Sequence, residues 1–291
     1  MIDAEKANFP VTLMCRCLEV SPSGYYASRR SEPSKRALEN VALTKEIEKV
    51  HKESRKTYGS PRVHAELRAK GHKVGRNRIA RLMAAKGIVG RRKPRFRKTT
   101  DSNHKDPIAP NILNRDFETD APDKAWVADI TYVWTCQGWM YLAVIIDLFS
   151  RRVVGWSMAE HMRTELVLNA LHAALGCRVP DLAGLIFHSD RGSQYASGDY
   201  RAALERAAIT CSMSRRANCW DNAVAESFFA TLKTELVHNV IFLTRASAKT
   251  AIAEWIEVFY NRKRRHSTIG YATPAEYEKR YFEQQEAAKA A

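Results

Sequence analysis

The segment AWVADITYVWTCQGWMYLAVIIDLFSRRVVGWSMAE (125–160) decides the fold class of this chain. It contains three successive runs rich in Val, Ile, Tyr and Trp, the residues that fit a pleated sheet. Gln137-Gly138 and Ser150-Arg151 separate these runs. We therefore expect three neighbouring antiparallel strands joined by short turns.

Downstream of these strands, helical and strand-like patterns alternate. Helices are predicted over 165–175, 198–207, 221–237, 246–260 and 274–284, with strands at LIFHSD (185–190) and ITCSMS (209–214). An antiparallel set followed by alternating helices and strands predicts an α/β fold, a mixed sheet flanked by helices.

Positive charge is concentrated in the first third of the chain. The formal net charge is +15, and residues 1–110 hold 26 Lys+Arg against 11 Asp+Glu, whereas residues 111–291 hold 21 of each. Residues 71–100 contain 11 Lys+Arg and no acidic residue. This asymmetry indicates two functional regions, with a nucleic acid as the partner of the first.

Short helices are predicted throughout this basic region. Ser21-Pro22 is a helix start, and a longer helix over 36–54 carries Leu38, Val41, Ile47 and Val50 on one stripe. Ser60-Pro61 begins a helix that ends at Gly71, and a second helix runs from Arg76 to Lys86 before Gly87. Two short helices joined at 71–75 predict a helix-turn-helix unit, preceding the α/β region. The second helix would present Arg76, Asn77, Arg78 and Arg81 to DNA as a recognition helix. A plain helical hairpin with a basic surface is the alternative.

These patterns divide the chain into five parts. We expect an N-terminal helical region (1–56), a helix-turn-helix DNA-binding segment (57–90), a basic linker (91–115), an α/β core with C-terminal helices (116–284) and a tail (285–291). The linker begins with Arg91, Arg92 and Lys93, which could lie along a phosphate backbone.

Three acidic residues are notable for their positions. Asp129 interrupts the first strand, Asp190 ends the apolar run LIFHSD, and Glu226 lies in the predicted helix after Asp221. Each alone is usually a satisfied hydrogen-bond acceptor. Carboxylates drawn together resist simultaneous ionisation unless a cation neutralises them, and oxygen ligands suit Mg²⁺ or Mn²⁺.

The spacing of these three acidic residues and the sequence motifs around them resemble those of a known family. Asp129 lies upstream of Asp190 and Glu226, which have 35 residues between them, a set that resembles the DDE triad of transposases and retroviral integrases on an RNase H-like fold. The words that carry the closer resemblance are YGSPR, GRNRIARLM, YLAVIIDLFSRRVVGW, HSDRGSQYAS, ANCWDNAVAESFFATLKTE and YNRKRRHSTIGYATPAEY. They are similar to the second-reading-frame (OrfB-type) transposase of frameshifting bacterial insertion sequences, in the right order from about Pro10 to Tyr281.

The resemblance implies a function. Asp129, Asp190 and Glu226 would be the catalytic residues and the ligands of two Mg²⁺ or Mn²⁺ ions in an integrase catalytic core that cleaves and transfers DNA strands. The partners would be element ends and target DNA, a homodimer or higher oligomer on that DNA, and a first-frame (OrfA-type) protein. Lys233, seven residues after Glu226, would hold the DNA end, although a solvated helix lysine is the alternative. Arg262, Arg264 and His266 would contact the DNA backbone, with a solvated helix end as the alternative.

Two neighbouring residues receive a plainer interpretation. His188 could touch a phosphate or orient a carboxylate, but a packed strand-end histidine is an equal alternative. Asp147 matches a recurrent acid of the family outside the triad, and we interpret it as structural.

Zinc and membrane insertion are not expected. The His-His-Cys-Cys zinc site of retroviral integrases is not matched, because Cys15 and Cys17 precede the histidines at 51, 64 and 72. The six cysteines form no CxxC pair, no apolar run approaches the roughly 20 residues that span a bilayer, and MIDAEKANFP does not resemble a signal peptide. We therefore expect a cytoplasmic bacterial protein that is nucleoid-associated when bound to DNA.

Two other functions remain open. A non-catalytic, sequence-specific DNA-binding protein with an inactive RNase H-like fold would bind DNA in a salt-dependent manner without metal-dependent turnover. A nuclease of the RNase H or resolvase type would cut nucleic acid without joining it to a target.

Overall fold

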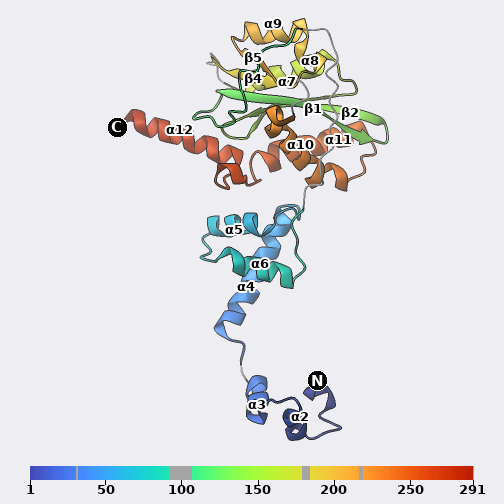
Figure 1. Ribbon diagram of the computed structural model, residues 1–291, viewed down its shortest axis with the longest axis vertical. Helices are drawn as coiled ribbons and strands as arrows, with labels where there is room; N and C mark the ends of the chain where they lie inside the picture. The colour runs from blue at the N-terminus through green and yellow to red at the C-terminus, as the bar shows by residue number, and fades with distance from the viewer. Residues whose placement is uncertain (31, 92–106, 179–183, 216–218, 291) are drawn as a thin grey trace.

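The computed structural model describes residues 1–30, 32–91, 107–178, 184–215 and 219–290. Figure 1 shows an α/β unit, a small helical unit beside it, and a further group of short helices near the N-terminus. Within the described residues, no helix is both long enough and apolar enough to cross a membrane.

The predicted mixed sheet is confirmed. Within the described residues, five strands form one sheet in the order β3-β2-β1-β4-β5. The first three are antiparallel, whereas β4 is parallel to β1 and β5 is parallel to β4. Their bounds are β1 (Ala125–Thr135), β2 (Gly138–Asp147), β3 (Val153–Ala159), β4 (Ile186–Ser189) and β5 (Thr210–Met213).

Helices cover both faces of the sheet, as Figure 1 shows. One face packs against α7 (Thr164–Cys177), α8 (Ser193–Ala196) and α9 (Gly198–Arg206), and the other against α10 (Ala223–Glu235), α11 (Arg245–Glu254) and the π-helical segment η3 (Trp255–Tyr260). Alternate residues of β1 serve the two cores, since Val127 packs with the α10 side and Trp126 with the α7 side.

A glycine sets the close approach of β3 to α7. A Cβ on Gly155 would lie 2.3 Å from the carbonyl oxygen of Ala170 and 2.7 Å from Cβ of Ala174. Only a residue without a side chain allows this spacing between strand and helix.

The predicted helix pair of the basic region is also present. The helices of this region are α1 (Ile2–Glu5), α2 (Val11–Cys17), α3 (Pro22–Arg30), α4 (Lys35–Glu53), α5 (Ser60–Ala69) and α6 (Arg76–Ala85). The turns after α5 and α6 use Gly71 (φ 87°) and Gly87 (φ 64°), because the left-handed conformation suits glycine. Ile47, Val63 and Ile79, from α4, α5 and α6, form a shared core.

The single apolar stripe predicted along 36–54 is only half right. Ile47 and Val50 are buried, but Leu38 and Val41 are 59% and 58% exposed. The N-terminal part of α4 extends beyond α5 and α6 (Figure 1), so these helices do not cover its apolar side chains.

The C-terminal region contains short 3₁₀ segments and a long last helix. The 3₁₀ segments are η1 (Cys219–Asn222), η2 (Val237–Asn239) and η4 (Ser267–Ile269), and α12 spans Pro274–Ala290. Residues 285–290, expected as a tail, continue α12, because Ala, Glu, Gln and Lys are strong helix formers.

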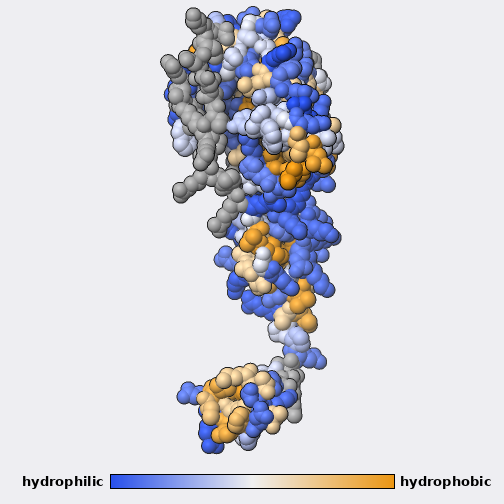
Figure 2. Space-filling model, turned by 90° about the vertical axis from the view of Figure 1, so that its right-hand side faces the viewer, coloured by the Kyte–Doolittle hydropathy of each residue, from blue (hydrophilic) through white to orange (hydrophobic). Residues whose placement is uncertain are grey.

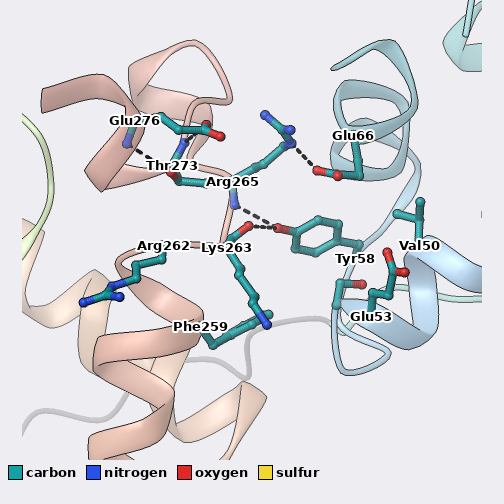
Figure 3. Close-up of a pocket in the computed structure, with 11 residues that line it drawn as sticks. Val50, Glu53, Tyr58, Glu66, Phe259, Arg262, Lys263, Arg265, Thr273 and Glu276 are labelled. Carbon is teal, nitrogen blue, oxygen red and sulfur yellow. Dashed lines mark hydrogen bonds and ion pairs between the residues drawn. The ribbon is translucent and has the colours of Figure 1, made fainter. Parts of the chain in front are cut away.

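The helix-turn-helix unit lies against the C-terminal region of the α/β unit. Figure 3 shows this junction, a cavity of about 210 Å³ lined by residues of both units. The hydroxyl of Tyr58 donates to the carbonyl of Lys263 (3.2 Å) and accepts from the backbone N–H of Arg265 (2.8 Å). The guanidinium of Arg265 in turn pairs with Glu66 of α5 (2.5 Å), so polar contacts join the two units.

Candidate active site

Two of the three predicted carboxylates meet because of strand register. In the parallel pairing of β1 with β4, Ala128 lies opposite Ser189. The next residues along the two strands are Asp129 and Asp190, which therefore emerge side by side at the end of β4. This is the carboxyl edge of a strand, where α/β sheets place their ligands.

The third carboxylate comes from α10, which packs against β1. Glu226 lies in the first turn of α10, and Asn222 directly precedes the helix. The Nδ2 of Asn222 donates to the carbonyl of Ala128 (3.0 Å). This hydrogen bond attaches the start of α10 to the strand residue that precedes Asp129.

The pKa shifts show that the three carboxylates share one environment with Lys233. Burial raises the pKa of Asp129 well above its usual value, and the charges of Asp190 and Glu226 raise it further. The backbone N–H of Ile130 (2.8 Å) and the Lys233 ammonium act in the opposite direction. Burial also raises the pKa of Glu226.

Lys233 is the cation of this group. Burial lowers its pKa, whereas the Asp129 carboxylate raises it. Its Nζ lies 4.9 Å from the ring centre of Tyr132 on β1. The lysine is therefore half-buried beside Asp129 and is not the fully solvated helix lysine of the alternative interpretation.

The donor set suits a hard divalent cation. Three carboxylates supply oxygen ligands only, and their mutual repulsion is the kind that a cation relieves. The buried Oδ1 of Asn222 has no hydrogen-bond partner among the described residues, which leaves an acceptor at this site. Within the described part of the chain, no three His, Cys, Asp or Glu side chains converge into a complete metal cluster, so an ion would have to draw the carboxylates closer.

Comparison with known proteins identifies the chain. Models of the "Integrase core domain" match residues 119–219 and 207–274, and a model of the "HTH-like domain" matches residues 38–96. The chain is 38% identical over 279 residues to the transposase InsF for insertion sequence IS3A of Escherichia coli (strain K12), covering 95% of this chain and 96% of InsF. The chain belongs to the insertion-sequence transposase family of InsF. It is thus a DDE transposase, a polynucleotidyl transferase that integrates DNA.

A second relative agrees with this assignment. The transposase is 46% identical over 270 residues to the insertion element IS600 uncharacterized 31 kDa protein of Shigella sonnei, covering 93% of this chain and 99% of that protein. Solved structures with partial similarity include a simian T-cell lymphotropic virus intasome (TM-score 0.46, 18% identity, 80% of this chain and 74% of that chain). The HTLV-2 integrase catalytic core domain in complex with magnesium has a TM-score of 0.43 and 16% identity, covering 55% of this chain and 99% of that chain.

The predicted recognition helix presents most, but not all, of its polar residues. Arg76, Asn77 and Arg81 are exposed on α6. Arg78 differs from these three, because its guanidinium is only partly exposed, faces α4 and donates to Asn40 (2.9 Å) and to Glu39 (3.2 Å). In the transposase, Arg78 therefore holds the helical unit together.

The basic linker is described only at its first residue. Arg91 is exposed, and its Nη1 donates to the carbonyl of Thr234 at the end of α10 (3.4 Å). Arg92 and Lys93 lie outside the described residues.

The predicted DNA contacts of the C-terminal basic cluster require a correction. Arg262 is exposed, but Arg264 is 2% exposed and donates to both carboxylate oxygens of Glu235 (2.8–3.1 Å). Arg264 also donates to Nε2 of His266 (3.1 Å), whose ring packs on Tyr260 at 4.9 Å. Arg264 therefore faces the interior, because the buried carboxylate of Glu235 requires a cation, whereas His266 is half-buried against Arg264 and Tyr260.

His188 and Asp147 are structural. His188 is fully buried between the hydroxyls of Ser212 (2.9 Å) and Ser214 (3.1 Å), and burial lowers its pKa to about 4. Asp147 is fully buried and accepts from the backbone and hydroxyl of Ser150 (2.8 and 2.7 Å). The packed alternative for His188 and the structural interpretation of Asp147 are both confirmed.

Asp221 is a supporting residue that the sequence analysis missed. It is fully buried just before α10 and accepts hydrogen bonds from Arg215, Arg115 and Asn111 (2.8–3.0 Å). The hydrogen bonds from Arg215 hold the pKa of Asp221 well below its usual range. The sequence marked Asp221 only as a helix start, because two of its three partners, Asn111 and Arg115, lie more than 100 residues upstream.

Proposed function

We propose that Asp129, Asp190 and Glu226 are the catalytic residues of this transposase and the ligands of two divalent cations, Mg²⁺ or Mn²⁺. The observation that carries the proposal is the register that sets Asp129 beside Asp190, together with the effect of Asp190 and Glu226 on the pKa of Asp129. Bound cations would supply the Lewis acidity that activates the attacking water or 3′-hydroxyl and stabilises the leaving oxygen.

The chain itself would orient these groups. The backbone N–H of Ile130 fixes Oδ1 of Asp129, and that of Gly192 fixes Oδ1 of Asp190 (3.0 Å). Asn222 holds the start of α10, and with it Glu226, against β1. Lys233 would hold the phosphate backbone of the DNA end, since its ammonium is half-buried in this site and acts on the Asp129 carboxylate.

The same site would serve both cleavage and strand transfer, because only the nucleophile differs between them. Water would release the strand, and a DNA 3′-hydroxyl would join it to a target. The charged groups needed to position a phosphate are the same in both steps.

The helix-turn-helix unit would bind DNA. Arg76, Asn77 and Arg81 are exposed on α6, and Arg91 and Arg262 add exposed cations closer to the α/β unit. Each phosphate that such a cation neutralises releases counterions, so we expect salt-sensitive binding. Because an element has two ends, we propose that the transposase acts as a dimer or higher oligomer on DNA.

A first-frame protein would bind the N-terminal helices. Phe9, Leu13, Leu18 and Val20 are 40–53% exposed there, and Figure 2 shows a largely hydrophobic surface on this part of the molecule. Exposed apolar surface of this extent is typical of protein interfaces.

We also propose that the transposase needs no structural zinc. The ring nitrogen Nδ1 of His51 is paired with the carbonyl of Tyr58 (3.2 Å), and Nε2 of His64 with the carbonyl of Val74 (3.1 Å). These backbone bonds give one ring nitrogen of each histidine a structural role within the helical unit, and the order of Cys15 and Cys17 before both histidines does not match the zinc site of retroviral integrases.

The catalytic assignment is tested by Asp190→Asn. The variant should bind labelled element-end DNA like the wild type but show no Mg²⁺-dependent cleavage or joining, because it loses one carboxylate of the site. Asp199→Asn, which changes an exposed acid on α9, is the matched control and should remain active. Joining at the wild-type rate by Asp190→Asn would contradict the proposal, and cleavage without any joining by the wild type would indicate a nuclease.

A further inference from the structure

Three large aromatic side chains are exposed together on the β1–β2 hairpin. Tyr132, Trp134 and Trp139 are 40%, 57% and 46% exposed. The rings of Tyr132 and Trp139 lie 5.0 Å apart, and those of Trp134 and Trp139 lie 4.8 Å apart, both edge to face. We call these three residues the aromatic ledge.

The aromatic ledge results from strand register. Trp134 is directly opposite Trp139 in the antiparallel pairing of β1 with β2, and Tyr132 is two residues before Trp134 on the same face of β1. Trp126 and Ala128, earlier on that face, are buried in the core formed with α7 and α9. The ledge continues this apolar face beyond the buried part of the core.

The ledge is connected to the proposed catalytic site through Lys233. Tyr132 lies three residues after Asp129 on β1, and Nζ of Lys233 lies 4.9 Å from its ring centre. No carboxylate of the described residues lies within ion-pair distance of Lys233. Its ammonium lies beside the ring of Tyr132, and the Asp129 carboxylate acts on it.

This combination of groups matches the chemistry of a nucleotide. A nucleotide offers a flat aromatic base for stacking and a phosphate for a cation. Bases inside an intact duplex are stacked on both faces, so they must unpair before they can stack on exposed aromatic side chains. An aliphatic protein surface has no anionic group that could pair with the cation beside Tyr132.

We infer that the aromatic ledge binds unpaired bases at the end of the element DNA, next to the phosphate held by Lys233. This rests on the proposed function, since it places the ledge beside the reacting phosphate. Stacking on the ledge would offset part of the cost of opening the terminal base pairs, and so position the strand for reaction.

The test compares two element-end DNAs, one fully paired and one with its terminal base pairs mismatched. Affinity is measured by fluorescence anisotropy with the full chain in Asp190→Asn form, so that no reaction interferes. The unaltered ledge should favour the mismatched end by roughly 5- to 100-fold, the range expected for base–aromatic stacking. The ratio of the affinities for the mismatched and the paired end should fall close to one in Trp134→Ala/Trp139→Ala. The variant Trp134→Phe/Trp139→Phe should largely retain the ratio.

Phe282→Ala is the matched control, because Phe282 is an aromatic residue of α12 with 48% exposure. It should leave the ratio unchanged. An unchanged ratio in the Trp134→Ala/Trp139→Ala variant would overturn the inference, even if Asp190→Asn is inactive as proposed. A preference for mismatches in target DNA instead of the element end would overturn the assignment to the end. A change in self-association by light scattering, with no change in the ratio, would show that a second copy occupies the ledge.

Discussion

Replacing Arg264 distinguishes a structural arginine from a DNA contact. The side chains of Arg264 and Glu235 are 3% and 6% exposed, and three hydrogen bonds of 2.8–3.1 Å join them. Burial by itself lowers the pKa of Arg264, but the Glu235 carboxylate offsets this and raises it overall. In Arg264→Met, the Glu235 carboxylate would remain in the interior without its main partner.

The expected cost is large. Removing one partner of a buried ion pair costs about 3–5 kcal/mol, because the remaining charge is desolvated and unpaired. For a protein of this size, this corresponds to a fall in Tm of roughly 6–20 °C. Arg62 lies 3.9 Å from Glu235 and is only a partial substitute at that distance. The double change Arg264→Met/Glu235→Leu should recover most of the loss, since neither charge is then left buried.

The assay is urea unfolding followed by circular dichroism, with DNA affinity measured at several salt concentrations. Arg262→Met is the matched control, because Arg262 is an exposed arginine two residues away. It should change the free energy of unfolding by less than about 0.5 kcal/mol. If Arg262 contacts a phosphate, the number of ions released on DNA binding, read from the salt dependence of the affinity, should fall by about one. A stability loss below about 1 kcal/mol in Arg264→Met, with weaker salt-dependent DNA binding, would refute our correction.

Two further predictions concern stability. Burial lowers the pKa of His188 to about 4, so the unfolded chain binds a proton below about pH 6.5 that the folded chain takes up only near pH 4. Stability should therefore fall by up to about 3 kcal/mol as the pH drops across this window, and His188→Gln, measured by urea unfolding at both ends, should lack this contribution. An equal loss in both proteins would show that other groups cause it. Gly155→Ala should cost about 1–3 kcal/mol, since the new Cβ would overlap the Ala170 carbonyl unless α7 moves, and an unchanged thermal unfolding midpoint would mean that α7 moves freely.

Much of the fold was predictable because its signals are local. Runs rich in Val, Ile, Tyr and Trp, separated by turn residues, marked the three antiparallel strands, and Gly71 and Gly87 marked the ends of α5 and α6. Such patterns reflect backbone preferences and one-sided burial, which neighbouring residues determine.

Burial that depends on distant elements was harder to predict. Leu38 and Val41 follow the helical period of Ile47, yet they are exposed because α5 and α6 do not extend over them. Arg264 is part of a basic run that is typical of a solvated surface, but Glu235 of α10 holds it in the interior.

The sequence by itself determined which residue types are available: a basic helical region, a mixed sheet and three acids with family-like spacing. Only the tertiary structure decided which of them meet. The parallel register of β1 and β4 sets Asp129 beside Asp190, and the packing of α10 on β1 adds Glu226 and places Lys233 over Tyr132. The physical reason is that strand pairing and helix packing join residues far apart in the chain, and their burial and mutual charge follow from that contact.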